Sequence, residues 1–427
     1  MRQTFKFKEF SKKQRMIFNW WTPESPVKDA NGIIADGSVR SGKTLSMSLS
    51  FVLWAMSAYN GEDFIMSGKT IGSFQRNVLK TLRVMLQSIG YTEDYHRSDK
   101  LLVVRKGDRE NHFYIFGGKD EQSQDLVQGM TAAGAFFDEV ALMPESFVAQ
   151  ATARCSVDGA KLWFNCNPAG PLHWFKVKWL DKHSDLGLVY LHFTMDDNLS
   201  LTQATRDRYA SMYTGVFYLR YIKGLWAVAE GLVYSMFNDE CLYEDEDRPP
   251  ATLNISRRTI ACDYGTTNPC VYLDIYDDGN TLWVENEYRW DSKSEDAQRL
   301  PTPNKTDAQY ADDMKEFMGD DPAKQCMIVV DPSAKSFITE LRLRGFWVKE
   351  GDNEVLDGIR KTASLIGQRK IRVNRRCYGL IAEMQSYVWD EKANQRGEEA
   401  PVKMLDHGPD ALRYYVNTCL PDWRTSL

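Results

Sequence analysis

The sequence predicts an α/β protein of two domains, each built on a sheet that is flanked by helices. Short runs rich in β-branched and aromatic residues alternate with helical patterns along all 427 residues, an alternation typical of parallel sheets. One sharp change in composition, the acidic run at 239–250 that closes on two prolines, separates these elements into two halves. Because proline interrupts helices and central strands, we expect the domain boundary within about ten residues of this run.

Five strands are expected in each half. In the first half they are 32–35, 63–66, 113–116, 135–137 and 161–164. In the second half they are 259–263, 271–275, 281–288, 327–330 and 370–373. The apolar run 45–59 is interrupted by serines and predicts a buried helix, and residues 200–223 also have helical character.

The composition is that of an ordinary globular protein, with 43% hydrophobic and 26% charged residues. The net charge of −6 gives no general indication of nucleic-acid binding, although local basic clusters occur. The eight cysteines form no Cys-x-x-Cys pair, so a structural zinc site is not expected. The N-terminal residues do not resemble a secretion signal, and we expect the protein to stay in the compartment where it is made.

A phosphate-binding loop is the clearest motif. Residues 37–44, Gly-Ser-Val-Arg-Ser-Gly-Lys-Thr, match G-x-x-x-x-G-K-[ST] and lie between an expected strand and an expected helix. Lys43 is expected to reach the β- and γ-phosphates of ATP, and the Thr44 hydroxyl to bind Mg²⁺. The nucleotide-binding residues predicted in this loop are Gly37, Ser38, Arg40, Ser41, Gly42, Lys43 and Thr44.

The acidic partner of this loop is expected at 134–139, an apolar strand that ends in Asp138 and Glu139. We expect Asp138 to hold the Mg²⁺ through its water shell. Glu139 would polarise the attacking water as a general base. Together the two motifs predict a P-loop ATPase domain.

Three further residue types are candidates for the nucleotide site. Asn167 follows the next strand and could sense the γ-phosphate, or it could belong to an Asn-Pro turn. Gln14 could bond an adenine edge, or it could be a surface glutamine. Arg40 could act in cis as an arginine finger, with Arg76 and Arg154 as alternatives.

The second half carries a set of carboxylates. Asp263 and Asp331 each end an apolar strand, and Asp406, His407 and Asp410 lie where a loop opens a helix. Three carboxylate positions of this kind can converge at one sheet edge and hold two Mg²⁺ or Mn²⁺ ions about 4 Å apart, which predicts a metal-dependent nuclease. His407 could complete one metal shell or move a proton.

Two alternatives apply to these carboxylates. A strand-terminal aspartate is often only a turn former, so each position alone is weak. Glu287, within the third expected strand of this half, is a possible fourth ligand or a solvent-facing residue.

Taken together, these motifs resemble the large subunit of tailed-phage terminases, most closely the group found in phages and prophages of Gram-positive bacteria. The resemblance covers nearly the whole chain and follows the family's order of motifs, here at 37–44, 134–139, 165–168, 224–231, 263–269, 330–333 and 406–412.

This resemblance implies an ATPase domain of the additional-strand type, with a mostly parallel sheet, followed by an RNase H-like nuclease domain. We expect the ATPase domain at 1–231 with a linker region at about 196–231, a connection at 232–256 and the nuclease domain at 257–427. Asp263 and Asp331 match the family's metal ligands. His407 and Asp410 fit the family's third ligand position best, and Asp406 is the alternative for that position.

The resemblance also implies a function and partners. ATP hydrolysis would translocate double-stranded viral DNA into a procapsid through a portal protein, and the nuclease would cut the concatemer. The expected partners include a small terminase subunit and further copies of the chain, which would be a ring on the procapsid or a monomer in solution. The expected location is the host cytoplasm and, transiently, the procapsid.

Two other functions fit part of the pattern. A DNA helicase or repair ATPase with an appended nuclease shares the phosphate motifs, but no second RecA-like core follows residue 231 in the sequence. Alternatively, the C-terminal domain is a docking surface without catalytic activity, and its carboxylates only form turns.

Overall fold

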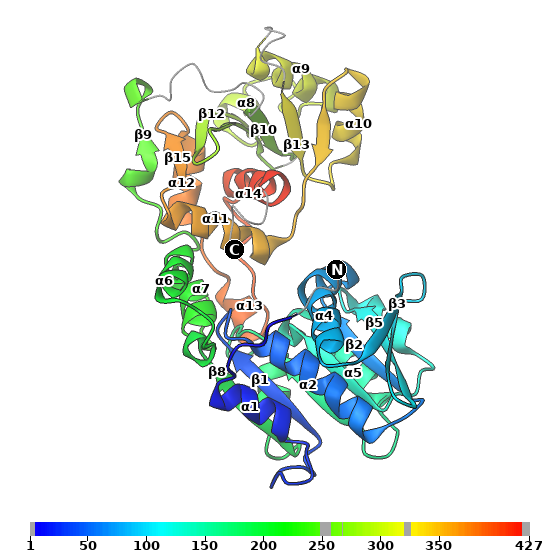
Figure 1. Ribbon diagram of the computed structural model, residues 1–427. Helices are drawn as coiled ribbons and strands as arrows, with labels where there is room; N and C mark the ends of the chain where they lie inside the picture. The colour runs from blue at the N-terminus through cyan, green and yellow to red at the C-terminus, as the bar shows by residue number, and fades with distance from the viewer. Residues whose placement is uncertain (1–4, 248–257, 267, 320–325, 421–427) are drawn as a thin grey trace. The chain divides into compact units, whose positions relative to one another are not determined.

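The computed structural model describes residues 5–247, 258–266, 268–319 and 326–420 (Figure 1). The chain forms two compact units. Unit 1 comprises Met1–Arg206, Tyr218–Val228 and Gln395–Glu398. Unit 2 comprises Asp207–Phe217, Ala229–Asn394 and Glu399–Leu427.

Unit 1 contains an eight-stranded sheet in the order β3-β4-β5-β2-β6-β7-β1-β8. The six strands from β5 to β8 in that order are parallel, and β3 and β4 extend the sheet as antiparallel strands. The strands are β1 (Gly32–Gly37), β2 (Asp63–Gly68), β3 (Thr92–His96), β4 (Leu101–Lys106), β5 (Arg109–Gly117), β6 (Gly134–Asp138), β7 (Lys161–Asn165) and β8 (Leu188–Phe193). The mostly parallel sheet predicted for the first half is confirmed.

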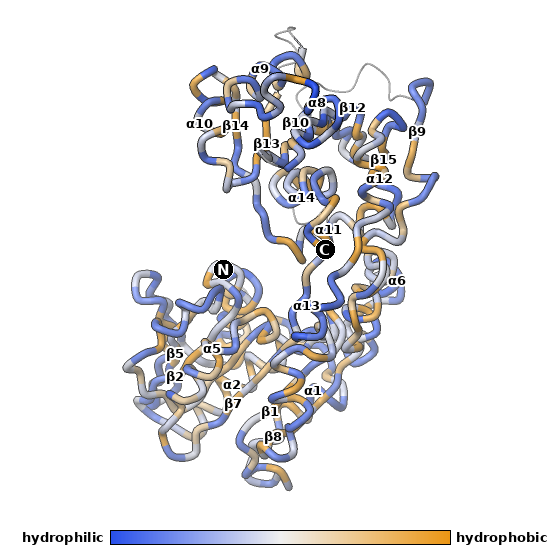
Figure 2. Tube along the Cα trace, turned by 180° about the vertical axis from the view of Figure 1, so that it is seen from behind, coloured by the Kyte–Doolittle hydropathy of each residue, from blue (hydrophilic) through white to orange (hydrophobic). Residues whose placement is uncertain are grey.

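Helices cover both faces of this sheet. They are α1 (Lys12–Asn19), α2 (Lys43–Ala58), α3 (Ile71–Phe74), α4 (Lys80–Ser88) and α5 (Glu145–Ala153). Because side chains alternate along a strand, Ile33 of β1 packs in the core with α1, α2 and α4, whereas Ile34 packs in the core with α5. Figure 2 shows apolar stretches along α2 and the sheet strands, as expected for elements that are buried on both sides.

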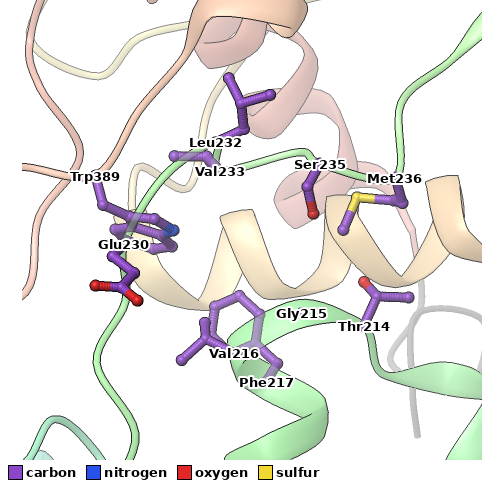
Figure 3. A pocket seen from close by; sticks show the side chains of 10 residues that line it. All are labelled: Thr214, Gly215, Val216, Phe217, Glu230, Leu232, Val233, Ser235, Met236 and Trp389. Carbon is purple, nitrogen blue, oxygen red and sulfur yellow. The ribbon is translucent and has the colours of Figure 1, made fainter.

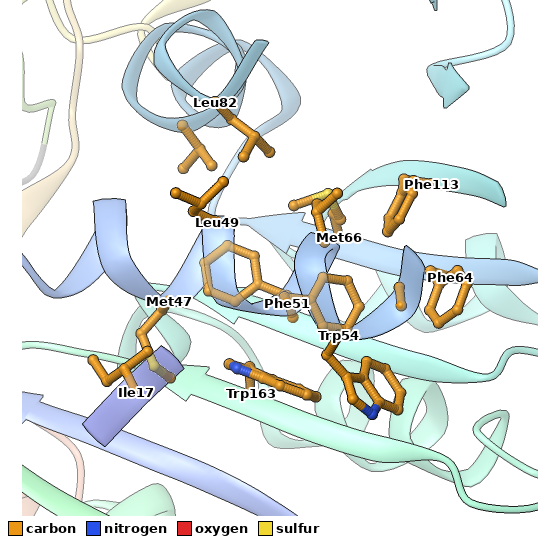
Figure 4. Packing of buried hydrophobic residues seen from close by; sticks show 14 of the residues in the cluster. Ile17, Met47, Leu49, Phe51, Trp54, Phe64, Met66, Leu82, Phe113 and Trp163 are labelled. Atoms are coloured by element: carbon orange, nitrogen blue, oxygen red, sulfur yellow. The ribbon is translucent and has the colours of Figure 1, made fainter. Parts of the chain in front are cut away.

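Aromatic side chains fill the core between α2 and the sheet (Figure 4). The ring centroids of Phe51 and Trp163 are 5.2 Å apart, and those of Trp54 and Trp163 are 4.8 Å apart. The predicted buried helix at 45–59 is therefore confirmed as α2, which begins directly after the phosphate-binding loop.

Unit 2 contains a seven-stranded mixed sheet in the order β14-β13-β10-β11-β12-β15-β9. Its strands are β9 (Leu242–Tyr243), β10 (Arg258–Asp263), β11 (Cys270–Asp277), β12 (Leu282–Trp290), β13 (Met327–Val330), β14 (Val348–Glu350) and β15 (Ile371–Asn374). The expectation of a parallel sheet is wrong for β10, β11 and β12, which are antiparallel. The connections between them are too short for a crossover helix, which a parallel pair requires.

Helices also cover both faces of the second sheet. They are α8 (Glu295–Gln298), α9 (Asp307–Met318), α10 (Lys335–Leu343), α11 (Val355–Gly367), α12 (Tyr378–Ser386) and α14 (His407–Cys419). Ile260 and Ile328 of the sheet pack in one core with α9 and α10, whereas α14 contacts β10, β11 and β13 and also packs against α11 and α12. Among the remaining helices, α7 (Gly215–Phe217) lies in unit 2, and α6 (Gln203–Met212) and α13 (Glu391–Gln395) each pass from one unit to the other.

The junction differs from the expected connection at 232–256. The chain first enters unit 2 at Asp207–Phe217, returns to unit 1 at Tyr218–Val228 and joins unit 2 again at Ala229. Val233 N donates to Tyr387 O at 2.8 Å. Strand β9, in the acidic run, pairs in parallel with β15, so this part of the run belongs to the second sheet. Residues 248–256, with both prolines of the run, lie outside the described residues. None of the helices within the described ranges is long and apolar enough to cross a membrane.

Candidate nucleotide and metal sites

The phosphate-binding loop leaves the carboxyl end of β1 and enters α2 at Gly42. β6 and β7 run parallel to β1, so their carboxyl ends reach the same sheet edge. Asp138 ends β6 and Asn165 ends β7, which brings both side chains to the loop.

The Lys43 side chain folds back into the loop. Its Nζ donates to three loop oxygens and one amide: Gly37 O at 3.0 Å, Ser38 O at 2.7 Å, Ser41 Oγ at 3.2 Å and Asn167 Oδ1 at 3.2 Å. Burial lowers the pKa of Lys43 to about 8. An ammonium that is partly desolvated in this way gains more than an exposed one from a phosphate beside it.

Thr44, Asp138 and Asn165 form one polar cluster. Thr44 Oγ1 donates to Asp138 Oδ1 at 3.1 Å, although the two residues are 94 positions apart. Asn165 Nδ2 donates to Thr44 Oγ1 at 2.9 Å and to the same Asp138 oxygen. Burial and the neighbouring Glu139 charge raise the pKa of Asp138, so a cation at this carboxylate would be stabilised.

A cavity of about 570 Å³ opens beside this cluster. Its walls include Arg40 to Thr44 of the loop, both acidic residues at the end of β6, and Asn167. The backbone of Glu139 is left-handed, with φ of 58°, which a residue other than glycine adopts rarely. Strain of this kind is typical of functional positions.

The remaining candidates for the nucleotide site do not all line this cavity. Arg76, in a π-helical turn at Gln75–Leu79, lines the cavity, but Arg154 does not. Gln14 is not a surface residue, since only 5% of it is exposed. Its Oε1 accepts from Ser11 N at 3.0 Å as part of the capping box of α1. Its amide lies against Gly42, where an added Cβ would be 2.4 Å from Gln14 Nε2.

A buried carboxylate beneath the loop was not expected from the sequence. Asp36, directly before Gly37, is fully buried. Trp226 Nε1 donates to Asp36 Oδ2 at 2.7 Å, and His192 Nδ1 lies 2.9 Å from Asp36 Oδ1. Trp226 belongs to the motif at 224–231, so that motif contacts the strand that carries the loop. A second missed residue is Asn198, whose Nδ2 donates to Arg40 O at 2.7 Å.

The second site lies in unit 2, where β10 and β13 are adjacent and parallel. Asp263 ends β10 and Asp331 directly follows β13, so both lie at the same sheet edge, as predicted. Helix α14 begins beside them, and His407 Nδ1 lies 2.9 Å from Asp263 Oδ2. Pro409 lies in the first turn of α14, also as predicted.

The carboxylates of this site influence one another. The pKa of Asp263 is raised to about 6, mainly by burial and also by the charges of Asp410 and Asp331, against the opposing bond from His407. Although burial alone would lower it, the pKa of His407 is raised by its bond to Asp263. Asp406, the N-cap residue of α14, has a raised pKa because of burial and the Asp410 charge.

Two partners of these carboxylates were not expected from the sequence. Tyr414 Oη donates to Asp331 Oδ2 at 2.8 Å. Arg413, with a side chain only 2% exposed, pairs with Asp410 at 3.0 Å. Both partners lie on α14, within eight residues of His407, but nothing in their spacing singles them out from other helix residues.

The donor set suits a hard divalent cation, because carboxylates bind Mg²⁺ and Mn²⁺ and an imidazole suits Mn²⁺ better than Mg²⁺. A bound cation would offset both causes of the raised pKa of Asp263, which are its burial and the repulsion from the neighbouring carboxylates. Within the described ranges, however, no three acidic, histidine or cysteine side chains are gathered closely enough to hold a metal ion. The candidate ligands are engaged by protein partners instead, so metal binding requires these side chains to reorient.

Glu287 does not face solvent, and protein groups bind its carboxylate. Its side chain is 5% exposed and pairs with Arg289 at 2.9 Å. Its second oxygen accepts from Leu380 N at 3.0 Å, so the carboxylate is used within the fold.

Unit 2 also contains a smaller cavity of about 110 Å³ (Figure 3). Phe217 and Trp389 contribute rings whose centroids are 6.3 Å apart, and Glu230 is the one ionisable residue of its lining. None of the predicted site residues lines it, so we assign no chemistry to this cavity.

Comparison with known proteins identifies one family. The family model described as terminase large subunit, T4likevirus-type, N-terminal, matches residues 34–239. The large terminase of a thermophilic bacteriophage is 51% identical, with a TM-score of 0.91 over 96% of this chain and 99% of that one.

Two further similarities bear on the sites. The large terminase of the same thermophilic bacteriophage has also been solved with ADP; that structure is 50% identical, with a TM-score of 0.89 over 96% of this chain and 99% of the other. The large terminase subunit of Escherichia phage T5 is 24% identical over 357 residues, which cover 78% of this chain and 75% of that protein.

Proposed function

Because the chain belongs to the large-terminase family, we propose that its two sheet-edge sites are the ATPase and nuclease centres of a DNA-packaging motor. Packaging of viral double-stranded DNA, driven by ATP and accompanied by cutting of the concatemer, is the function of the protein. A helicase or repair ATPase and a purely docking C-terminal domain are not favoured. One observation carries the assignment: two chemically different polar sites lie at the carboxyl edges of two separate sheets in one chain.

In the ATPase centre, the loop at 37–44 binds the phosphates and Lys43 contacts the β- and γ-phosphates. Thr44 and Asp138 hold Mg²⁺, which neutralises charge on the phosphates. The 3.1 Å contact between these two side chains supports a shared ion. Glu139 is the general base and borders the same cavity.

Four further residues belong to this proposed centre. Asn167 senses the γ-phosphate, a role supported by its contact with Lys43 at 3.2 Å. Arg40 and Arg76 both border the cavity and are the candidates for the arginine finger in cis. Gln14 supports the loop at Gly42, and its amide also contacts an adenine edge when nucleotide is bound.

In the nuclease centre, Asp263, Asp331, His407 and Asp410 hold two Mg²⁺ or Mn²⁺ ions. Such a pair supplies an activated water and stabilises the leaving 3′ oxygen. The residues of the chain orient these ligands: Tyr414 bonds Asp331, and Arg413 pairs with Asp410. Asp406, the N-cap residue of α14, is the alternative ligand to His407 and Asp410.

The packaging machinery provides the partners of the protein. We propose that the chain works in the host cytoplasm as a ring of copies docked on the portal protein of the procapsid, and that the small terminase subunit delivers DNA to it. Free in solution, the chain is a monomer. Sedimentation of the purified chain, alone and with procapsids, measures both states; a stable ring without procapsids would contradict the proposal.

Two matched substitutions test the proposed centres independently. We expect Glu139→Gln to bind ATP but to lose hydrolysis by at least about 100-fold, as removal of a general base does. We expect Asp263→Asn to abolish Mn²⁺ binding in a calorimetric titration while the ATPase rate stays unchanged. Full hydrolysis by the first variant, or undiminished Mn²⁺ binding by the second, would remove the corresponding assignment.

A further inference from the structure

A partly buried arginine with two buried carboxylate partners lies next to the nuclease centre. Arg289 of β12 donates Nη1 to Glu383 Oε1 at 2.7 Å and Nη2 to Glu383 Oε2 at 2.9 Å. Its Nε donates to Glu287 Oε1 at 3.0 Å. The two glutamate side chains are only 4% and 5% exposed, so each charge depends on this arginine for compensation.

The two glutamates differ in the backbone amide that each one binds. Glu287 Oε2 accepts from Leu380 N at 3.0 Å, within α12. Glu383 Oε2 accepts from Gly408 N at 2.6 Å, in the first turn of α14. A negative charge at a helix N-terminus is stabilised by the unpaired amides there, so Glu383 suits this position.

Gly408 permits this close approach. A Cβ at this position would lie 3.0 Å from Glu383 Oε2 and 3.0 Å from Leu380 Cδ1. A methyl group here therefore requires Glu383 Oε2 and Leu380 to shift by a few tenths of an ångström relative to the first turn of α14. The glycine in the segment at 406–412 thus has a packing reason that the sequence alone does not reveal.

The first turn of α14 also carries residues of the nuclease centre. His407, directly before Gly408, has its Nδ1 2.9 Å from Asp263 Oδ2. Asp410 follows two residues later and donates its N–H to Asp406 O at 2.8 Å. A metal site tolerates errors of only about 0.5 Å in its ligands, so a shift of this turn would disturb the whole set.

We propose that Glu383, held by Arg289, is a positioning residue of the nuclease metal centre. It binds Gly408 N–H and thereby fixes where α14 begins and how His407 and Asp410 face Asp263. This proposal rests on the metal-binding function proposed above. Glu287 serves only the fold, although it shares the same arginine.

The test compares two isosteric variants, Glu383→Gln and Glu287→Gln. Each removes one buried carboxylate from Arg289, but only the first weakens the acceptor of Gly408 N–H. Residues that orient metal ligands typically contribute about 10- to 100-fold to metal affinity, so we expect this loss of Mn²⁺ affinity in Glu383→Gln. In Glu287→Gln we expect less than about a 3-fold change. Calorimetric titration with Mn²⁺ measures the affinity, and melting of the metal-free protein measures the structural cost of each variant.

A third variant separates position from charge. Gly408→Ala keeps every carboxylate but crowds the contact between the first turn of α14 and Glu383 Oε2, so we expect it to weaken Mn²⁺ binding as Glu383→Gln does. Equal losses in both glutamate variants, or wild-type affinity in Gly408→Ala, would overturn the proposal. Asp263→Asn in the same titration distinguishes failure of this proposal from failure of the proposed metal site. If this variant binds Mn²⁺ normally, the metal site itself is misassigned.

Discussion

The pH dependence of nucleotide binding follows from the burial of Lys43. Burial lowers the pKa of its ammonium group to about 8 in the nucleotide-free protein. Bound phosphates favour the charged form, so the complex retains the proton at a higher pH than the free protein does. When the pH rises through about 8, Lys43 of the free protein therefore loses the proton that the complex requires, and nucleotide binding weakens.

The magnitude can be worked from this pKa. With a pKa of about 8, roughly three quarters of Lys43 is protonated at about pH 7.5 and roughly 3% at about pH 9.5. The dissociation constant of ADP should therefore rise by about 25-fold across this interval if the complex stays protonated. The free energy of unfolding of the nucleotide-free protein also depends on pH through Lys43. The pKa is lowered from 10.5 on folding, so the contribution of Lys43 to the stability of the free protein is least favourable below about pH 8 and rises by about 3 kcal/mol as the pH rises to about 10.5.

Fluorescent ADP titrated without Mg²⁺ measures the binding directly, because Asp138 then has no bound ion whose affinity changes with pH. Lys43→Met is the matched control; it lacks the titrating group and should bind weakly with little dependence on pH. A wild-type dissociation constant that is flat across the interval would refute the reasoning. A rise of equal size in Lys43→Met would refute it too.

Three further substitutions give separate predictions. Trp226→Phe leaves one oxygen of the fully buried Asp36 carboxylate without its 2.7 Å donor, and should lower the free energy of unfolding by about 1–3 kcal/mol, measured by urea titration. Tyr414→Phe removes the 2.8 Å bond that orients Asp331, and should weaken Mn²⁺ binding by about 10-fold without changing the ATPase rate. Gly42→Ala places a side chain at φ of 87°, and should lower the melting temperature and abolish the stabilisation by ADP. Unchanged unfolding, unchanged Mn²⁺ affinity or retained ADP stabilisation, respectively, would contradict these predictions.

The site residues at strand ends could be predicted from the sequence because local patterns mark them. Lys43 follows a glycine-rich turn between a strand and a helix, and Asp138, Asp263 and Asp331 each close an apolar run. The carboxyl ends of neighbouring parallel strands meet at one edge, so the convergence of these residues follows from sheet geometry.

The contacts that support these site residues could not be predicted from the sequence, because they join positions far apart in the chain. Asp36 and Trp226 are 190 residues apart, and Arg289 and Glu383 are 94 residues apart. A single sequence contains no periodicity that pairs such residues. The solvent-facing alternative for Glu287 was wrong for the same reason: its arginine partner is visible in the strand, but its burial against α12 is not.

Composition misled the prediction of strands at the sheet edges. Strand β9 lies in an acidic run that is typical of a linker, yet it pairs with β15 at the edge of the second sheet. Charged residues are common on edge strands because they prevent pairing with other chains. The antiparallel hairpin of β3 and β4 was missed in unit 1, where it also forms an edge of the sheet.

The central claim is that one chain carries two separate active sites. Its most direct test is degradation of plasmid DNA by the purified protein with Mn²⁺, for the wild type, Asp331→Ala and Lys43→Ala. We expect Asp331→Ala to be inert and Lys43→Ala to cut like the wild type. If both variants cut like the wild type, the nuclease centre does not lie at the edge formed by β10 and β13, and the assignment of unit 2 is wrong.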